Sequence, residues 1–139
     1  MGTLKRFGVS IEEKLLKKLD SYVKSRRYIN RSEALRDLIR KELVNSQWIG
    51  EEDEEVAGAI IIVYDHHQKE LVDNIIDIQH DYYKVIISSQ HIHLDHRICL
   101  EVIIVKGMIS RLFELENKLK VIKGVKHAQL AKSTLARDI

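Results

Sequence analysis

Proline is absent from the 139-residue sequence, and cysteine occurs once, at position 99. A single cysteine cannot form an internal disulfide, which fits a reducing compartment, and the N-terminal residues lack the order of a signal peptide. The longest apolar run, residues 56–64, is about half the length that a membrane-spanning helix requires. We therefore expect a cytoplasmic protein without a membrane span.

Positive charge is concentrated in the N-terminal third of the chain. Residues 1–45 carry 12 Lys/Arg against 6 Asp/Glu, whereas the remaining residues carry 11 against 15. A basic N-terminal third beside an acidic remainder is typical of a nucleic-acid-binding domain joined to a different module. A solvated basic helix surface would give the same balance.

The first 45 residues show one alternating segment followed by two helical patterns. Residues 5–11 alternate between two sides, which predicts a short strand. Its apolar side consists of Phe7, Val9 and Ile11, and its polar side consists of Arg6, Gly8 and Ser10. Apolar residues at helical spacing predict a helix over residues 12–26 and a second one that ends near residue 44, with Asn30 or Ser32 as its N-cap.

A lone strand in so small a domain would leave backbone groups unpaired and bury little surface. Pairing with the same strand of a second chain solves both problems. The paired strands would present Arg6, Gly8 and Ser10 as a ribbon, as ribbon-helix-helix proteins do when they enter the major groove. We therefore predict a ribbon-helix-helix domain over residues 1–45 with operator DNA as its partner; a surface ribbon without a ligand is the alternative.

The rest of the chain predicts a linker and a second domain. Residues 46–55 are polar and acidic without clear periodicity, which indicates a linker. Residues 56–139 then predict strands and helices in the order 56–64 (strand), 67–83 (helix), 84–93 (strand), 99–106 (strand), 110–122 (helix) and 125–132 (strand). This βαββαβ order is that of a ferredoxin-like domain with both helices on one sheet face, so the fold class is α+β. The uncovered face favours self-association.

Metal-binding side chains concentrate in the predicted hairpin, in the stretch HIHLDHRIC of residues 91–99. With a loop over 94–98, His93 lies opposite Cys99 and Glu101 lies opposite His91, so two imidazoles and a thiol share one face. Such ligands suit zinc, copper or nickel rather than magnesium or calcium. The candidates for a missing fourth ligand are His66, His67 and His80. Exposed histidines beside a buried apolar cysteine are the alternative.

The same residues could supply a nucleophile and a base for a hydrolytic reaction. They lie on regular strands, however, and no glycine-rich or oxyanion-forming loop accompanies them. We therefore do not expect an enzyme.

Four short patterns resemble the nickel-responsive transcriptional regulators of the NikR family. They are RFGVS at residues 6–10, NRSEALRD at 30–37, CLE at 99–101, and the spacing His-x10-His-x-His-x5-Cys that begins with His80 of the pair Gln79-His80. The resemblance covers nearly the whole chain. It implies a nickel-dependent repressor of nickel uptake that binds paired operator half-sites, and a homotetramer in which ACT-like domains of the ferredoxin fold form the core.

The resemblance also implies roles for individual residues. One planar Ni(II) per chain would be held by His91, His93 and Cys99 of one subunit and by His80 of its neighbour. Glu101 and Tyr64 would support these ligands from beside the metal. The residues implied in auxiliary metal coordination are His66 and His67, for which two exposed histidines at a strand end are the alternative.

The resemblance further implies a second cation, often potassium, at Glu33 and Asp37, which lie four residues apart on one helix face. An ordinary pair of surface acids is the alternative. At Gly8 the sequence departs from the family, which usually has Thr or Ser in the middle of the DNA-reading face. A hydrogen-bonding side chain is lost there, so the operator sequence is left open.

Two other functions fit parts of the pattern. A ribbon-helix-helix regulator whose ACT-like domain senses a small molecule, such as an amino acid, would leave the histidines without a role. A nickel-storage or delivery protein would bind metal without specific affinity for DNA. Metal-dependent binding to DNA separates all three functions.

Overall fold

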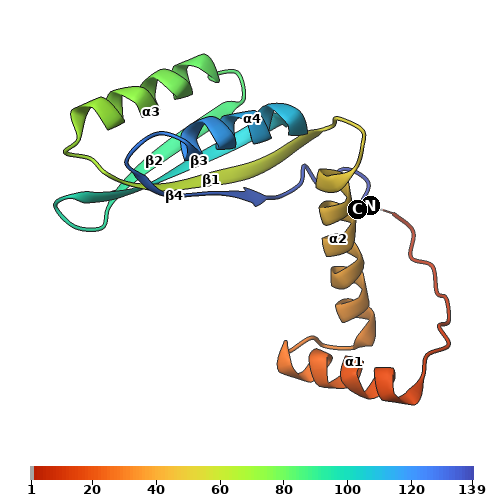
Figure 1. Ribbon diagram of the computed structural model, residues 1–139. Coiled ribbons are helices and arrows are strands. Elements are labelled where there is room, and N and C mark those ends of the chain that lie inside the picture. The colour runs from red at the N-terminus through yellow and green to blue at the C-terminus, as the bar shows by residue number, and fades with distance from the viewer. Residues whose placement is uncertain (1) are drawn as a thin grey trace. The chain divides into compact units, whose positions relative to one another are not determined.

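The computed structural model describes residues 2–139 and contains two compact units, Met1–Glu42 and Leu43–Ile139. Figure 1 labels the helices and strands. They follow the order α1 (Glu13–Ser25), α2 (Arg31–Ile49), β1 (Glu55–Asp65), α3 (Lys69–Asp81), β2 (Ile86–His93), β3 (Ile98–Met108), α4 (Ile109–Lys120) and β4 (Val125–Lys132). This content confirms the predicted α+β class. No helix within residues 2–139 is long and apolar enough to cross a membrane.

The turn between α1 and α2 is closed by backbone and side-chain bonds. Arg27 has a φ of 60°, and the amides of Arg27 and Tyr28 donate to carbonyls in the last turn of α1 at 3.1 and 3.0 Å. This is the pattern of a Schellman C-cap. Arg31 then donates to both carboxylate oxygens of Asp20 at 2.8 and 2.9 Å, which ties the start of α2 to α1.

Asn30 is the residue that caps α2, because its side-chain oxygen accepts the backbone N–H of Glu33 at 2.9 Å. Ser32, the other candidate, lies inside the first helical turn. We expect Asn30→Ala to lower the free energy of unfolding by about 1 kcal/mol, the usual cost of losing such a cap. Ser32→Ala is the matched control and should have a much smaller effect in chemical denaturation. Equal losses in the two variants would contradict this assignment.

The predicted strand over residues 5–11 is absent from the single chain. Residues 2–12 have no regular secondary structure, and the side chains of Phe7 and Val9 are 77% and 62% exposed. The physical reason is that a strand needs a partner for its backbone groups, and no other segment within residues 2–139 pairs with this one. Pairing with a second chain stays a prediction.

The predicted linker over residues 46–55 is wrong at its beginning, because α2 continues through the first four of these positions. Trp48 explains the difference. Its ring is 2% exposed, donates from Nε1 to the carbonyl of Ser133 at 2.8 Å and packs edge-on against Phe113. The last helical turn is thus held by a buried anchor, and the irregular connection shortens to residues 50–54.

The second unit is a four-stranded antiparallel sheet in the order β2-β3-β1-β4, and α3 and α4 lie on the same face of it (Figure 1). This is the predicted ferredoxin-like arrangement. Alternate β1 side chains are buried against the helices, as the period of two along a strand requires. The largest fully buried apolar side chains of the core are Tyr64, Ile60, Ile62, Ile75, Ile103, Leu112, Leu115 and Leu119.

The opposite face of the sheet carries no helix (Figure 1). Its side chains include Ile92 and Ile104, which are 40% and 38% exposed. Both alternate along their strands with residues that point toward the helices. Apolar side chains are therefore available on this face, and the predicted self-association through it stays a prediction.

Candidate metal centre

The β2–β3 hairpin has the register that the spacing of the histidines predicts. His93 lies opposite Cys99 and His91 lies opposite Glu101, while Tyr64 of β1 pairs with Cys99 from the other side. The hairpin turns through residues 94–97, where the carboxylate of Asp95 accepts two backbone N–H groups at 2.8 Å. The backbone thus brings potential ligands from β2 and β3 to one end of the sheet.

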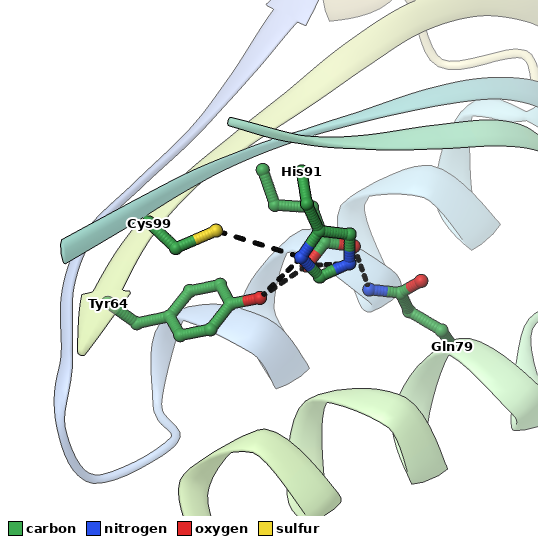
Figure 2. Close-up of polar contacts among 5 residues, drawn as sticks. Tyr64, Gln79, His91 and Cys99 are labelled. Atoms are coloured by element: carbon green, nitrogen blue, oxygen red, sulfur yellow. Dashed lines mark hydrogen bonds and ion pairs between the residues drawn. The ribbon is translucent and has the colours of Figure 1, made fainter. Parts of the chain in front are cut away.

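His91 lies against both the thiol and the phenol of this site. Its Nδ1 atom is 3.6 Å from Sγ of Cys99 and 3.2 Å from the hydroxyl oxygen of Tyr64 (Figure 2). Cys99 and Tyr64 are buried, whereas the His91 side chain is 52% exposed. One imidazole nitrogen and one sulfur therefore face each other at the edge of the core, which solvent reaches on the His91 side.

Glu101 is a fully buried carboxylate at the centre of the network. Its Oε1 atom accepts the hydroxyl of Tyr64 at 2.8 Å and lies 3.4 Å from Nε2 of His91, and its Oε2 atom accepts the side-chain amide of Gln79 at 2.6 Å. A buried charge is tolerated only with such partners. A carboxylate beside one ring nitrogen of a histidine is the usual support for metal binding through the other, which here faces Cys99.

Tyr64 keeps its proton in this setting. Burial, together with its hydrogen bond to the carboxylate of Glu101, raises the pKa of Tyr64 far above its usual value. The hydroxyl therefore stays protonated at neutral pH and donates to Glu101. Tyr64 and Glu101 thus lie where the sequence predicts supporting residues, next to His91 and Cys99.

Gln79 belongs to this network, and although it is part of the family resemblance, the sequence indicated no role for it. It lies on α3, and its amide reaches Glu101 across the helix–sheet interface (Figure 2). A buried carboxylate needs hydrogen-bond donors. The sequence does not indicate which residue of the covering helix donates to Glu101. His80 follows Gln79 on α3, about 100° further round the helix.

His80 is exposed and lines a surface hollow of about 270 Å³ with Ile76, Gln79, Tyr83 and Ile86. It does not join the other predicted ligands. Nowhere in residues 2–139 are three His, Cys, Asp or Glu side chains close enough together to hold a metal ion by themselves. The single chain therefore brings His91 and Cys99 into contact, places His93 across from Cys99, and leaves His80 apart.

His66 and His67, for which auxiliary metal coordination is predicted, lie beside this hairpin. The ring of His66 is 4.6 Å from that of His93 and 4.5 Å from that of His67, measured between centroids. Nδ1 of His66 is buried without a hydrogen-bond partner. His66 is therefore next to a predicted ligand, with an unsatisfied nitrogen.

Glu33 and Asp37 each have a partner in the first unit. Glu33 binds Arg36, while Asp37 accepts the hydroxyl of Tyr28 and forms an ion pair with Lys41 at 3.3 Å. The hydrogen bond from Tyr28 and the neighbouring lysine lower the pKa of Asp37. The structure does not direct the two carboxylates to a common cation.

Arg6, Gly8 and Ser10 all lie in the exposed N-terminal segment without regular secondary structure. The structure assigns them no partner surface. Their predicted role depends on the two-chain ribbon, which the single chain does not form.

The ligand types of the hairpin site fit a borderline transition metal. A thiol and imidazole nitrogens suit Ni(II), Zn(II) or copper, and hard cations such as Mg(II) and Ca(II) prefer oxygen. The contact between Cys99 and His91, with Glu101 behind the imidazole, is an arrangement that such an ion can use.

Comparison with known proteins identifies both halves of the chain. A model of the NikR C-terminal nickel-binding domain matches residues 57–133, and a model of ribbon-helix-helix proteins of the copG family matches residues 5–46. Among solved structures, an uncharacterized protein from Thermotoga maritima covers 57% of this chain and 98% of its own, with a TM-score of 0.53 at 15% identity. That last likeness concerns the fold alone.

Relatives that match along nearly the whole chain carry the name "Putative nickel-responsive regulator". One from Syntrophus aciditrophicus is 56% identical over 94% of each chain. Another from Chlorobium phaeobacteroides is 53% identical over 96% of this chain and 98% of its own, and one from Pyrococcus furiosus is 48% identical over 96% of both. The chain therefore belongs to the family of nickel-responsive regulators that join a ribbon-helix-helix domain to a NikR C-terminal nickel-binding domain.

Proposed function

We propose that this protein is a cytoplasmic, nickel-dependent repressor that binds operator DNA when it holds Ni(II) and so controls nickel uptake. The observation that carries this proposal is the 3.6 Å contact of Cys99 with His91, backed by the buried carboxylate of Glu101. The family is one of regulators, which agrees with the expectation that the protein is not an enzyme.

The nickel ion would be held by His91, His93 and Cys99 of one chain and by His80 of another, with one ion per chain. Three nitrogens and one sulfur form a ligand set that Ni(II) accepts, and a planar preference would distinguish it from Zn(II), which favours a tetrahedron. When bound, nickel would be shared by ligands from two subunits and would link them. Glu101, Tyr64 and Gln79 keep the imidazole of His91 oriented.

A second chain completes the proposed site, because within residues 2–139 of one chain no three His, Cys, Asp or Glu side chains come together to hold a metal ion. We therefore propose a homotetramer whose core is built from the sheet domains. The exposed apolar side chains of the open sheet face, among them Ile92 and Ile104, are the surface that such a core would bury.

DNA binding would come from the N-terminal segment. Pairing of two copies would bury Phe7 and Val9 and present Arg6, Gly8 and Ser10 to the major groove, with two such ribbons on paired half-sites. A potassium ion at Glu33 and Asp37 is part of the proposal. The present partners contact Oε1 of Glu33 and Oδ2 of Asp37, so the ion would use the other oxygen of each carboxylate.

Nickel can promote DNA binding only to the extent that it binds the DNA-competent arrangement more tightly than the others. The same coupling requires operator DNA to increase the affinity for nickel by an equal factor. Regulation thus follows from the sharing of one ion between subunits, without a chemical reaction.

The proposal is tested by titrating the purified full-length protein with Ni(II) at neutral pH. We expect saturation near one ion per chain, a thiolate-to-nickel charge-transfer band, and retardation of promoter DNA only in the presence of nickel. DNA binding that responds to amino acids instead of nickel would identify a small-molecule sensor. Tight nickel binding without specific DNA affinity would identify a storage or delivery protein.

A further inference from the structure

The turn of the metal-site hairpin is attached to the end of β1. A guanidinium nitrogen of Arg97 donates to Oδ2 of Asp65 at 2.8 Å, and the backbone N–H of His66 donates to the carbonyl of Arg97 at 3.0 Å. The other carboxylate oxygen of Asp65 accepts the backbone N–H of His67 at 2.9 Å. One arginine thus joins the β2–β3 turn to β1 through both its side chain and its backbone.

This ion pair differs from an ordinary surface pair in its burial. The side chain of Asp65 is 4% exposed, whereas that of Arg97 is 62% exposed. A buried carboxylate needs its partners, so the contact restrains the turn more firmly than a pair of solvated side chains does. The largely exposed side chain of Arg97 reaches from the turn to the buried carboxylate of Asp65.

The other hydrogen bonds of the turn residues 94–97 lie within the turn itself, among them the one from the N–H of Leu94 to the carbonyl of Ile98 at 2.9 Å. β2 is an edge strand that pairs only with β3, and every one of its residues after Ile86 is exposed. Hairpin ends with few buried contacts open readily. His93 is the last residue of β2, and Cys99 is the second residue of β3, so opening at this end would separate the two.

We infer that Arg97 is a positioning residue: with Asp65 it latches the β2–β3 turn onto β1 and so keeps His93 opposite Cys99 for metal binding. This inference rests on the proposed nickel site. A site held in its binding geometry before the ion arrives binds more tightly, because ordering the ligands no longer reduces the affinity.

The test compares Arg97→Gln with the wild type in the full-length protein. The nickel affinity is measured by competition with a chelator. Amide hydrogen exchange is followed in the metal-free state at His66, whose N–H donates to the carbonyl of Arg97, and at Leu94, whose N–H donates to the carbonyl of Ile98. We expect the nickel affinity to fall by about 10- to 100-fold, as for other groups that orient metal ligands. The stoichiometry should not change, and both amides should exchange faster.

Arg137→Gln is the matched control, because Arg137 also pairs with a carboxylate, that of Glu55, and is 67% exposed, but lies away from the hairpin. Arg137→Gln should change neither the nickel affinity nor the amide exchange of His66 and Leu94. Arg97→Lys, which keeps the charge, should recover part of the affinity. If Arg97→Gln does not fold, Asp65→Asn keeps an acceptor for His67 and should give the same loss.

Wild-type affinity and unchanged exchange in Arg97→Gln would overturn the latch and leave the nickel function intact. A wild type that shows no nickel–thiolate band would instead overturn the proposed function and this role of Arg97 with it. The two failures are therefore distinguished by the wild-type titration alone.

Discussion

Replacing Cys99 with alanine is expected to abolish the nickel–thiolate charge-transfer band and to lower the nickel affinity by more than about 100-fold, beyond the cost of losing a group that only orients a ligand. Cys99 is the sole thiol of the chain, and its sulfur lies 3.6 Å from the imidazole nitrogen of His91. Without it, the proposed ion loses its only soft ligand. Nickel-dependent retardation of operator DNA should disappear as well.

Cys99→Ser is the matched control for this result, since it keeps the size of the buried side chain but offers a hydroxyl, which is a poor ligand for this class of ion. Both variants should be similar in thermal unfolding without metal. The measurements are absorption spectroscopy during a nickel titration and a mobility-shift assay with and without nickel. Normal nickel-dependent DNA binding by Cys99→Ala would refute the proposed sensor site.

The second large effect is expected at Glu101. Replacing it with leucine removes the carboxylate beside His91 and leaves the hydroxyl of Tyr64 and the amide of Gln79 without their acceptor. We expect nickel affinity to fall by about 10- to 100-fold. The loss of this acceptor should also lower the free energy of unfolding by about 1–3 kcal/mol, measured by chemical denaturation.

Two companion variants separate orientation of the ligand from stability. Glu101→Gln keeps the shape and an oxygen acceptor but lacks the charge, so it should retain more stability than leucine while still binding nickel more weakly. Gln79→Leu removes one donor and leaves Glu101 beside His91. Its effect on nickel affinity should therefore be smaller than the effect of either Glu101→Leu or Glu101→Gln. Unchanged affinity in both Glu101 variants would show that the carboxylate serves folding alone.

Much of the site was predictable because it depends on local geometry. Side chains alternate along a strand, so His91 and His93 had to share a face, and a short hairpin loop had to place Cys99 across from His93. The observed register has these pairs. The helices and strands of the second unit follow the apolar periodicity in the same way.

The features that the sequence did not reveal depend on distant partners. Trp48 extends α2 through a hydrogen bond to Ser133, which is 85 residues away, and no pattern near Trp48 indicates that contact. Gln79 is visible as a polar helix residue, but its partner lies on a strand. The predicted N-terminal strand fails in the single chain for the opposite reason, because its partner would be another copy of itself.

Trp48 has a practical consequence, because it is the one tryptophan of the protein and therefore its main natural fluorophore. The indole is shielded from water beside Phe113 and held by its hydrogen bond at the place where α2 ends. Its emission will report whether that last helical turn stays seated on the sheet domain, since exposure to water shifts indole emission to longer wavelength. A shift in the emission wavelength of the unlabelled protein would thus report whether nickel binding changes the environment of the end of α2.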